Sequence, residues 1–301
     1  MDIKTEVRDF LSSRRARLTP EQAGLPAWGT NRRVKGLRRE EVALLAGVSA
    51  EYYVRLERGN LGGVSEQVLE AVASALQLDD AERAHLFGLA RTASARKPVG
   101  TPRRPVRPAV QWLLESMTGT AAYVRNHRTD LLAANTLGRA LYAPVYEMPG
   151  RPNVARFVFL DPRAQDFFAE WDKVAGEAAA MLRTLAGENP YDQGLAGLVG
   201  ELSTRSEVFA QSWARHDVRL HRTGVKRFHH PIVGDLTLAY EALDLAADSG
   251  LRLNAYVAEP GTASAEAFGL LASWATTPLS IDGGDPLDRQ DAQARNPKPR
   301  P

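Results

Sequence analysis

The sequence predicts two domains of different class, an all-α domain over residues 1–94 and an α+β domain over residues 109–276. Three observations indicate this division. Apolar residues recur at helical spacing in the first third of the chain, and alternating, strand-like patterns begin only after it. A proline-rich segment separates the two parts. Residues 1–108 hold 19 Lys/Arg against 13 Asp/Glu, whereas the remainder holds 19 against 23, so the first part is basic.

The bulk composition restricts the possible chemistry. At 301 residues, 44% hydrophobic and 25% charged, the chain is long enough to form two hydrophobic cores. It contains no cysteine, which excludes disulfides, thiolate zinc sites and cysteine nucleophiles. No apolar run approaches the roughly 20 residues of a membrane helix, and the start MDIKTEVRDF is too charged for a secretory signal. We therefore expect a cytoplasmic protein with no membrane partner.

The N-terminal domain is expected to consist of helices. The segments IKTEVRDFLSSRRARL and SEQVLEAVASALQL carry apolar residues at helical spacing, the second behind an N-cap at Ser65. DDAERAHLFGLAR follows as a further helix, whose acidic first turn suits the helix dipole. The segment ARKPVGTPRRPVRP, residues 95–108, has four prolines and no acidic residue, and it predicts an extended linker.

Residues 37–60, LRREEVALLAGVSAEYYVRLERGN, predict a helix-turn-helix. Gly47 can adopt the positive φ that ends the first helix, and Ser49 can cap the second by accepting a backbone N–H. Tyr53 and Leu56, three residues apart, then face inward. The outer face of the second helix, which could enter a DNA major groove, carries Ala50, Glu51, Val54, Arg55 and Arg58.

This stretch resembles the helix-turn-helix of phage-repressor-like (XRE-type, Cro/cI-type) regulators, in which LAGVS, a short recognition helix and LE-x-G recur in the same order. The resemblance implies that Arg15 and Glu57 pair inside the fold. It also implies that the second helix of the motif, beginning at Ala50, faces base edges. The start of the first helix, at Arg38, is then expected on phosphate. From the resemblance, Ala50, Glu51 and Arg55 are expected on base edges, and Arg38 and Arg39 on phosphate. With the other outward-facing residues and the insertion, the predicted DNA-contacting residues are Arg38, Arg39, Ser49, Ala50, Glu51, Tyr52, Val54, Arg55, Arg58, Arg32 and Arg33.

Several of these residues have an alternative interpretation. Tyr52 could pack at the rim of the core, and Glu51 could simply complement the helix dipole. Arg32 and Arg33 belong to an insertion, TPEQAGLPAWGTNRRVKG at residues 19–36, and could either clamp phosphate or keep the loop solvated. Arg55 is the strongest candidate for reading a base, because arginine can bind guanine O6 and N7 with two hydrogen bonds.

The C-terminal domain reads as a hairpin, then helices, then three strands. AAYVRNHRTDLLAAN predicts strands at 121–125 and 130–134, followed by a helix from Asn135. Helices are expected at 163–186, 206–216 and 264–274, and strands in KRFHHP, GDLTLAYEALDL and LRLNAYVAEP. This order predicts an antiparallel sheet with helices on one side, and residues 277–301 are expected to be disordered.

The insertion and the strings VFLDPRAQ, ARHDVR, KRFHHPIVGDLTL and YVAEPG make the chain similar to MmyB-like transcription regulators. This resemblance covers nearly the whole chain. It implies that residues 109–276 form a PAS-like ligand-binding domain whose expected ligand is a long-chain fatty acid or a similar apolar small molecule.

Candidate ligand residues combine apolar bodies with polar groups. The aromatic side chains could line a pocket or simply form the core, and the cations of ARHDVRLHRTGVKRFHHP could hold a carboxylate or face solvent. The ligand-binding residues predicted are Trp171, Trp213, His216, Arg219, Tyr256 and Phe228. The histidine spacing matches no metal motif, and we expect no metal and no cofactor.

The leading hypothesis is a ligand-responsive, sequence-specific DNA-binding transcription regulator that acts as a homodimer on a double-stranded operator. One alternative is a protein-interaction or antitoxin-like helical module with a sensor domain. The other is an enzyme acting on a small apolar substrate. The enzyme is disfavoured because the sequence contains no G-x-S-x-G elbow, phosphate-binding loop or metal motif.

Overall fold

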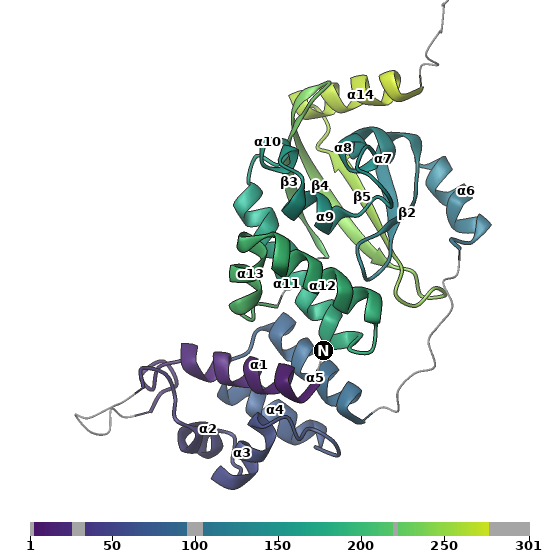
Figure 1. Ribbon diagram of the computed structural model, residues 1–301. Helices are drawn as coiled ribbons and strands as arrows, with labels where there is room; N and C mark the ends of the chain where they lie inside the picture. Colours follow the sequence, from purple (N-terminus) through teal and green to yellow (C-terminus); the bar gives the residue numbers. More distant parts are fainter. Residues whose placement is uncertain (1–2, 26–33, 95–104, 219–221, 277–301) are drawn as a thin grey trace, which may run out of the picture.

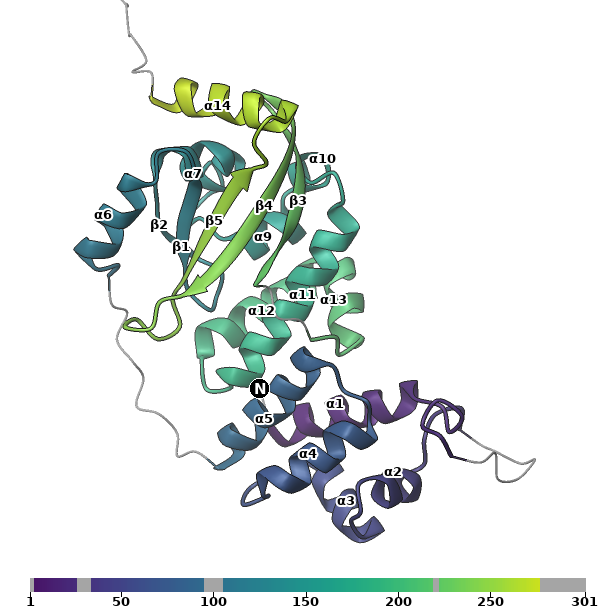
Figure 2. The ribbon, with the colours of Figure 1, turned by 180° about the vertical axis from the view of Figure 1, so that it is seen from behind.

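The computed structural model describes residues 3–25, 34–94, 105–218 and 222–276 (Figure 1). The predicted contacts at Arg32, Arg33 and Arg219 fall outside these ranges, as do most of the predicted linker and the C-terminal tail. The elements form a helical body at the N-terminal end and a sheet with helices at the other (Figures 1 and 2). None of the described helices is long and apolar enough to cross a membrane.

The N-terminal body contains α1 (Ile3–Arg17), α2 (Arg39–Leu45), α3 (Ala50–Glu57), α4 (Glu66–Ala75) and α5 (Asp80–Ser94). Its core gathers apolar side chains from all five of these helices, among them Phe10, Val42, Tyr53, Val72 and Leu86. Ser65 caps α4 as predicted, because its Oγ accepts from the Val68 N–H at 3.4 Å. The all-α prediction for this domain is confirmed.

The C-terminal body is built on an antiparallel sheet of five strands within the described residues. They are β1 (Ala121–Arg125), β2 (Leu131–Ala134), β3 (Thr223–His230), β4 (Gly234–Asp244) and β5 (Arg252–Ala258), in the order β2-β1-β5-β4-β3. Pairing of β1 with β5 joins the hairpin to the later meander, with Tyr123 opposite Asn254. On β3 and β4, Lys226 lies opposite Leu238.

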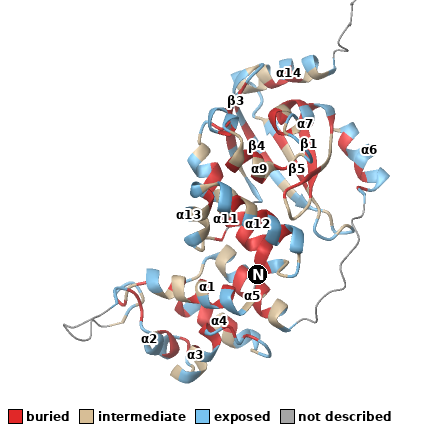
Figure 3. Ribbon diagram, viewed as in Figure 1, coloured by how far each residue is buried: buried red, intermediate tan, exposed pale blue. Residues whose placement is uncertain are grey.

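Most helices of this body contribute to one core on the inner face of the sheet. They are α7 (Thr136–Leu141), α8 (Ala143–Tyr146), α9 (Val154–Leu160), α10 (Arg163–Phe167), α11 (Trp171–Glu188), α12 (Gln193–Arg205), α13 (Glu207–Ala214) and α14 (Ala263–Thr276). Figure 3 shows buried residues concentrated between these helices and the strands. The α+β class predicted from the sequence is confirmed.

Three details differ from expectation. The helix predicted at 163–186 is two helices, because the backbone at Phe168 and Ala169 leaves helical geometry to bond with β3, where the Ala169 N–H donates to the Arg227 carbonyl at 3.1 Å. Helices α8, α9 and α12 were not predicted. The expectation of helices on one side is wrong for α6 (Pro108–Ser116), whose Val110 and Leu114 pack with β1 residues on the opposite face.

Candidate nucleic-acid interface and ligand-binding core

The ends of α3 are defined by local backbone geometry. Ser49 Oγ accepts from the Tyr52 N–H at 3.1 Å, which caps the helix. Gly47 has φ +65°, so it forms the turn before α3 as predicted. Gly59 has φ +90°, and a Cβ there would lie 2.5 Å from the Lys4 Cα, so only glycine fits at the end of the helix. Helix α3 thus begins and ends at defined residues, and it packs against both α2 and α1.

The two faces of α3 are divided as the sequence predicts. Tyr53 and Leu56 are buried at 0% and 1% exposure. Ala50, Tyr52 and Val54 are half-buried, and Glu51, Arg55 and Arg58 are exposed. The Arg55 guanidinium lies 4.7 Å from the centre of the Tyr52 ring, a cation–π distance that limits its freedom. Tyr52 thus supports Arg55 at the rim of the core.

A buried carboxylate connects α1, α2 and α3. Glu57 accepts from Arg15 Nη2 at 2.8 Å and from Arg39 Nε at 2.6 Å. The predicted pairing of Arg15 with Glu57 is confirmed. Arg39, a predicted DNA contact, therefore has one nitrogen engaged, although its side chain remains 55% exposed. Arg38 is exposed at the start of α2, where its backbone N–H donates to Glu41 Oε2 at 2.6 Å.

The predicted ligand residues lie in two places. Phe228 and Tyr256 are fully buried in the core of the C-terminal body, with ring centres 6.0 Å apart. Trp171 is half-buried at the start of α11 and donates its indole N–H to the Val158 carbonyl at 3.0 Å. Trp213 packs against the same core, but its ring also lies over Arg183 where the two bodies meet, and His216 lies at this junction outside the core. The structure therefore does not bring the described members of this set into one site.

The inner face of the sheet also holds polar residues that the sequence analysis missed. Arg125 is 3% exposed, Lys226 is 9% exposed and Asn254 is 1% exposed. The hydroxyl of Tyr142 donates to that of Tyr256 at 2.8 Å in the same core. Strand alternation could have identified this face, because Arg125 follows the inward-facing Tyr123 by two positions.

Helix α5 packs against α11 (Figure 2), and a buried charge cluster joins α11 to α1. Arg183 Nη1 donates to Glu6 Oε1 at 2.6 Å, and both side chains are at most 5% exposed. His85 Nε2 lies 3.8 Å from the same oxygen, beyond hydrogen-bonding distance. The Arg183 guanidinium also lies 4.1 Å from the Trp213 ring and donates to the Trp213 carbonyl. This cluster joins the two bodies.

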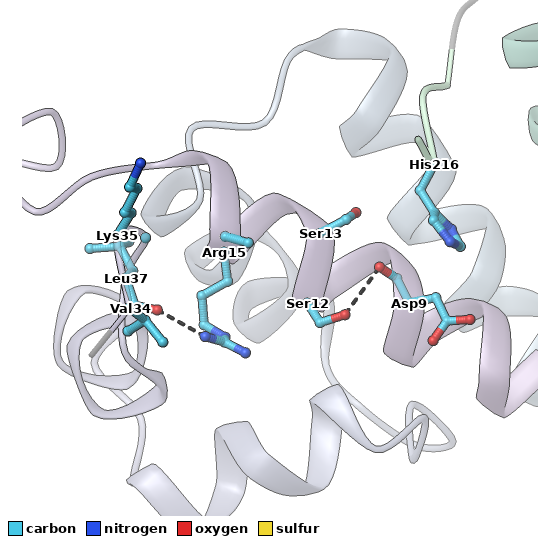
Figure 4. Close-up of a pocket in the computed structure, with 10 residues that line it drawn as sticks. Asp9, Ser12, Ser13, Arg15, Val34, Lys35, Leu37 and His216 are labelled. Carbon is cyan, nitrogen blue, oxygen red and sulfur yellow. Dashed lines mark hydrogen bonds between the residues drawn. The ribbon is translucent and has the colours of Figure 1, made fainter. Parts of the chain in front are cut away.

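A second group of contacts extends the junction. Arg17 pairs with Asp217 at 2.6 Å, and Arg14 donates to the His216 carbonyl while pairing with Glu82 at 2.7 Å. Figure 4 shows His216 approaching α1 at one end of a shallow pocket that continues towards Lys35. Burial, followed by the charge of Arg183, lowers the pKa of His216. A neutral His216 at this junction fits the neighbouring arginines.

The Glu6 carboxylate predicts a specific sensitivity to acid. Burial opposes its ionisation, but the neighbouring His85 and the charge and hydrogen bond of Arg183 outweigh it and lower the pKa of Glu6 to about 2. Because this pKa lies below the unfolded value, the stabilisation is present above pH 4.5 and is lost as the pH falls towards 2, by about 3 kcal/mol in all. Between pH 5 and 3, the free energy of unfolding measured with urea should therefore fall more steeply with pH for the wild type than for Glu6→Gln. Equal pH slopes would contradict the assignment.

Comparison with known families finds two matches. Residues 106–271 match the MmyB-like transcription regulator ligand binding domain, and residues 8–86 match a helix-turn-helix domain. The first match covers more than half of the 301 residues, and the second includes α2 and α3. Both agree with the resemblances indicated by the sequence motifs. No curated protein sequence matches the chain significantly.

Proposed function

The chain belongs to the family of MmyB-like transcription regulators, ligand-responsive DNA-binding proteins, and from this premise we propose how it recognises its operator and its effector. The outer face of α3 reads base edges in the major groove, and the start of α2 contacts phosphate. A small molecule bound in the core of the C-terminal body changes the position of this reading head.

One observation carries the proposal for DNA. The exposed face of α3 presents Glu51, Arg55 and Arg58 on a helix that the buried Glu57 ties to both neighbouring helices. A rigidly held helix orients its side chains before DNA arrives, so little conformational entropy is lost on binding. The cation–π contact with Tyr52 has the same effect on Arg55.

The reading head acts as one half of a homodimer. Eight residues of α3 extend about 12 Å, which spans only about four base pairs of a duplex that rises 3.4 Å per pair along each strand. Such a short site occurs too often in a genome to direct a regulator. Two copies on half-sites about 10 base pairs apart, or a multiple of that distance, supply the missing specificity.

The effector is a fatty acid or a similar apolar small molecule bound in a PAS-like core. Support comes from the aromatic cluster between the sheet and the helices, where Tyr142, Phe167, Phe228 and Tyr256 pack edge to face. Aromatic surroundings of this kind favour ligands with a large apolar body. The few polar groups in the same core provide orientation.

Helix α11 offers a path from the core to the reading head. Its residue Met181 contacts Arg125 inside the sheet domain, with Sδ 3.3 Å from Nη2. Two residues later, Arg183 binds Glu6 of α1, and near its end Gly187 fits against His85 of α5. A ligand that displaces α11 therefore moves the two bodies relative to each other. It regulates through its different affinities for the DNA-binding arrangement and for the arrangement that does not bind DNA.

A selection from random double-stranded DNA tests this proposal. The full chain should enrich a pair of related half-sites, and its affinity for that operator should change when dodecanoate is added. If no sequence is enriched, the helical body is better explained as a protein-interaction or antitoxin-like module. An enzyme would instead require measurable turnover of a small apolar substrate.

Arg38→Ala is expected to weaken binding to all DNA sequences by a similar factor. Because Arg38 is exposed at the start of α2, we propose a contact with one phosphate and the release of about one counterion. The slope of log K against log salt should become shallower by about 0.9. Titrations of operator and unrelated DNA at several salt concentrations measure this slope. An unchanged slope would remove Arg38 from the interface.

A further inference from the structure

The outer face of the sheet, opposite the ligand-binding core, is covered over one half only. Helix α6 packs Val110 and Leu114 over β1 and β2, in a small core that also includes Leu253 of β5. Figure 2 views the sheet from this side and shows β3 and β4 with no described helix in front of them. Every outward-facing residue of these two strands is exposed. The half of the face formed by β3, β4 and the adjoining side of β5 is therefore open.

A row of apolar side chains crosses this open face. Val225 of β3 is paired with Ala239 of β4, and Ala239 is paired with Val257 of β5. Val225 is 52% exposed, Val257 is 44% exposed, and Leu243, further along the outer side of β4, is 51% exposed. The solvated face of an antiparallel sheet is normally polar. A continuous apolar row on that face indicates that another surface packs on it.

Opposite charges flank the row at the end of the strands from which α14 follows. Arg227, two positions beyond Val225 on β3, is 60% exposed and lies 3.9 Å from Glu170, a weak pair at this exposure. Glu259, two positions beyond Val257, is exposed where β5 ends. Strands β3 and β5 run in the same direction on either side of β4. The two charges therefore lie at the same end of the open face, on opposite sides of its centre.

We propose that this open face binds the same face of a second copy of the chain and is the interface of the homodimer. The proposal rests on the proposed function, in which the reading head is one half of a homodimer, and it names the surface that joins the halves. A two-fold axis that runs along β4 places Val225 of one copy over the partner's Val257. It also brings Arg227 opposite the partner's Glu259, so the charge pattern complements itself.

Two features select a second copy as the occupant. A face that carried charges of one sign would repel its own copy, whereas this face carries one charge of each sign beside its apolar row, and the two-fold rotation exchanges them. The helical body lies beyond one end of the strands (Figure 2). Because the axis runs along the strands, both helical bodies of the dimer lie at that same end, as two half-sites on one duplex require.

Sedimentation velocity of the full chain over a range of concentrations tests the interface. The wild type should form dimers. Val225→Glu and Val257→Glu should each weaken self-association at least about 10-fold, because each dimer then buries two carboxylates against apolar side chains. Leu270→Glu is the matched control, since Leu270 is 66% exposed on α14 and lies outside the open face. Its self-association should equal that of the wild type.

A charge exchange gives a readout that a damaged fold would not produce. Arg227→Glu and Glu259→Arg should each weaken self-association at least about 3-fold, because each places like charges opposite one another across the interface. The double variant Arg227→Glu/Glu259→Arg restores opposite charges and should recover the self-association of the wild type. A double variant as weak as the two single variants would overturn the proposal.

The same measurements separate this surface from the proposed function. If both valine variants remain as dimeric as the wild type, the homodimer stands and this surface is wrong. If the wild type stays monomeric at every concentration, this surface is wrong as well, and enrichment of paired half-sites from random DNA would still retain the homodimer. If the valine variants dissociate but no DNA sequence is enriched, the surface stands and the proposed DNA recognition is wrong.

Discussion

Arg183→Ala is expected to lower the free energy of unfolding by about 3–5 kcal/mol, the usual cost of breaking a buried ion pair by removing one partner. The variant leaves the Glu6 carboxylate buried without its counter-charge and removes the cation–π contact with Trp213. Because the pair joins α1 to α11, much of the loss should fall on the junction between the bodies. Urea unfolding at pH 7 should change from one transition towards two.

The functional consequence is loss of coupling. In Arg183→Ala, operator binding and effector binding should each persist, whereas the change in operator affinity caused by dodecanoate should largely disappear. Arg205→Ala is the control, because Arg205 is 60% exposed on α12 and pairs with Glu201 four residues earlier. Its effect on stability should stay below about 0.5 kcal/mol. An undiminished response to dodecanoate in Arg183→Ala would exclude this junction as the coupling path.

Arg55→Ala is expected to remove base discrimination rather than general DNA affinity. Two hydrogen bonds from one guanidinium to a base edge contribute about 1–3 kcal/mol to discrimination, which corresponds to about 10- to 100-fold in affinity for the preferred operator. Binding to unrelated DNA should change far less. Comparing operator and unrelated DNA in titrations at one salt concentration gives the ratio directly.

Two further variants make this test specific. Tyr52→Leu should cause a smaller loss of discrimination, because it removes only the ring that supports the Arg55 guanidinium at 4.7 Å. Arg83→Ala should leave base discrimination unchanged, since Arg83 of α5 pairs with Glu70 of α4 and neither residue belongs to α3. If Arg55→Ala weakened both DNAs equally, Arg55 would be a phosphate contact instead.

Local patterns account for what was predicted correctly. The caps at Ser49 and Ser65, the positive φ at Gly47 and the inward side of α3 each depend on residues within one or two helical turns. The strands of the meander follow in the same way from alternation and turns. The pairing of Arg15 with Glu57, 42 residues apart, came from the family resemblance and not from spacing.

The sequence by itself determined the two domain classes, the helix-turn-helix and the outward face of α3, because these depend on short-range periodicity and capping. Only the tertiary structure decided the pairing of β1 with β5, the position of Trp213 and His216 at the junction, and the burial of Arg125 and Lys226. Alternation along a strand tells which residues share a face, but whether a cation on that face meets a carboxylate depends on elements more than a hundred residues away.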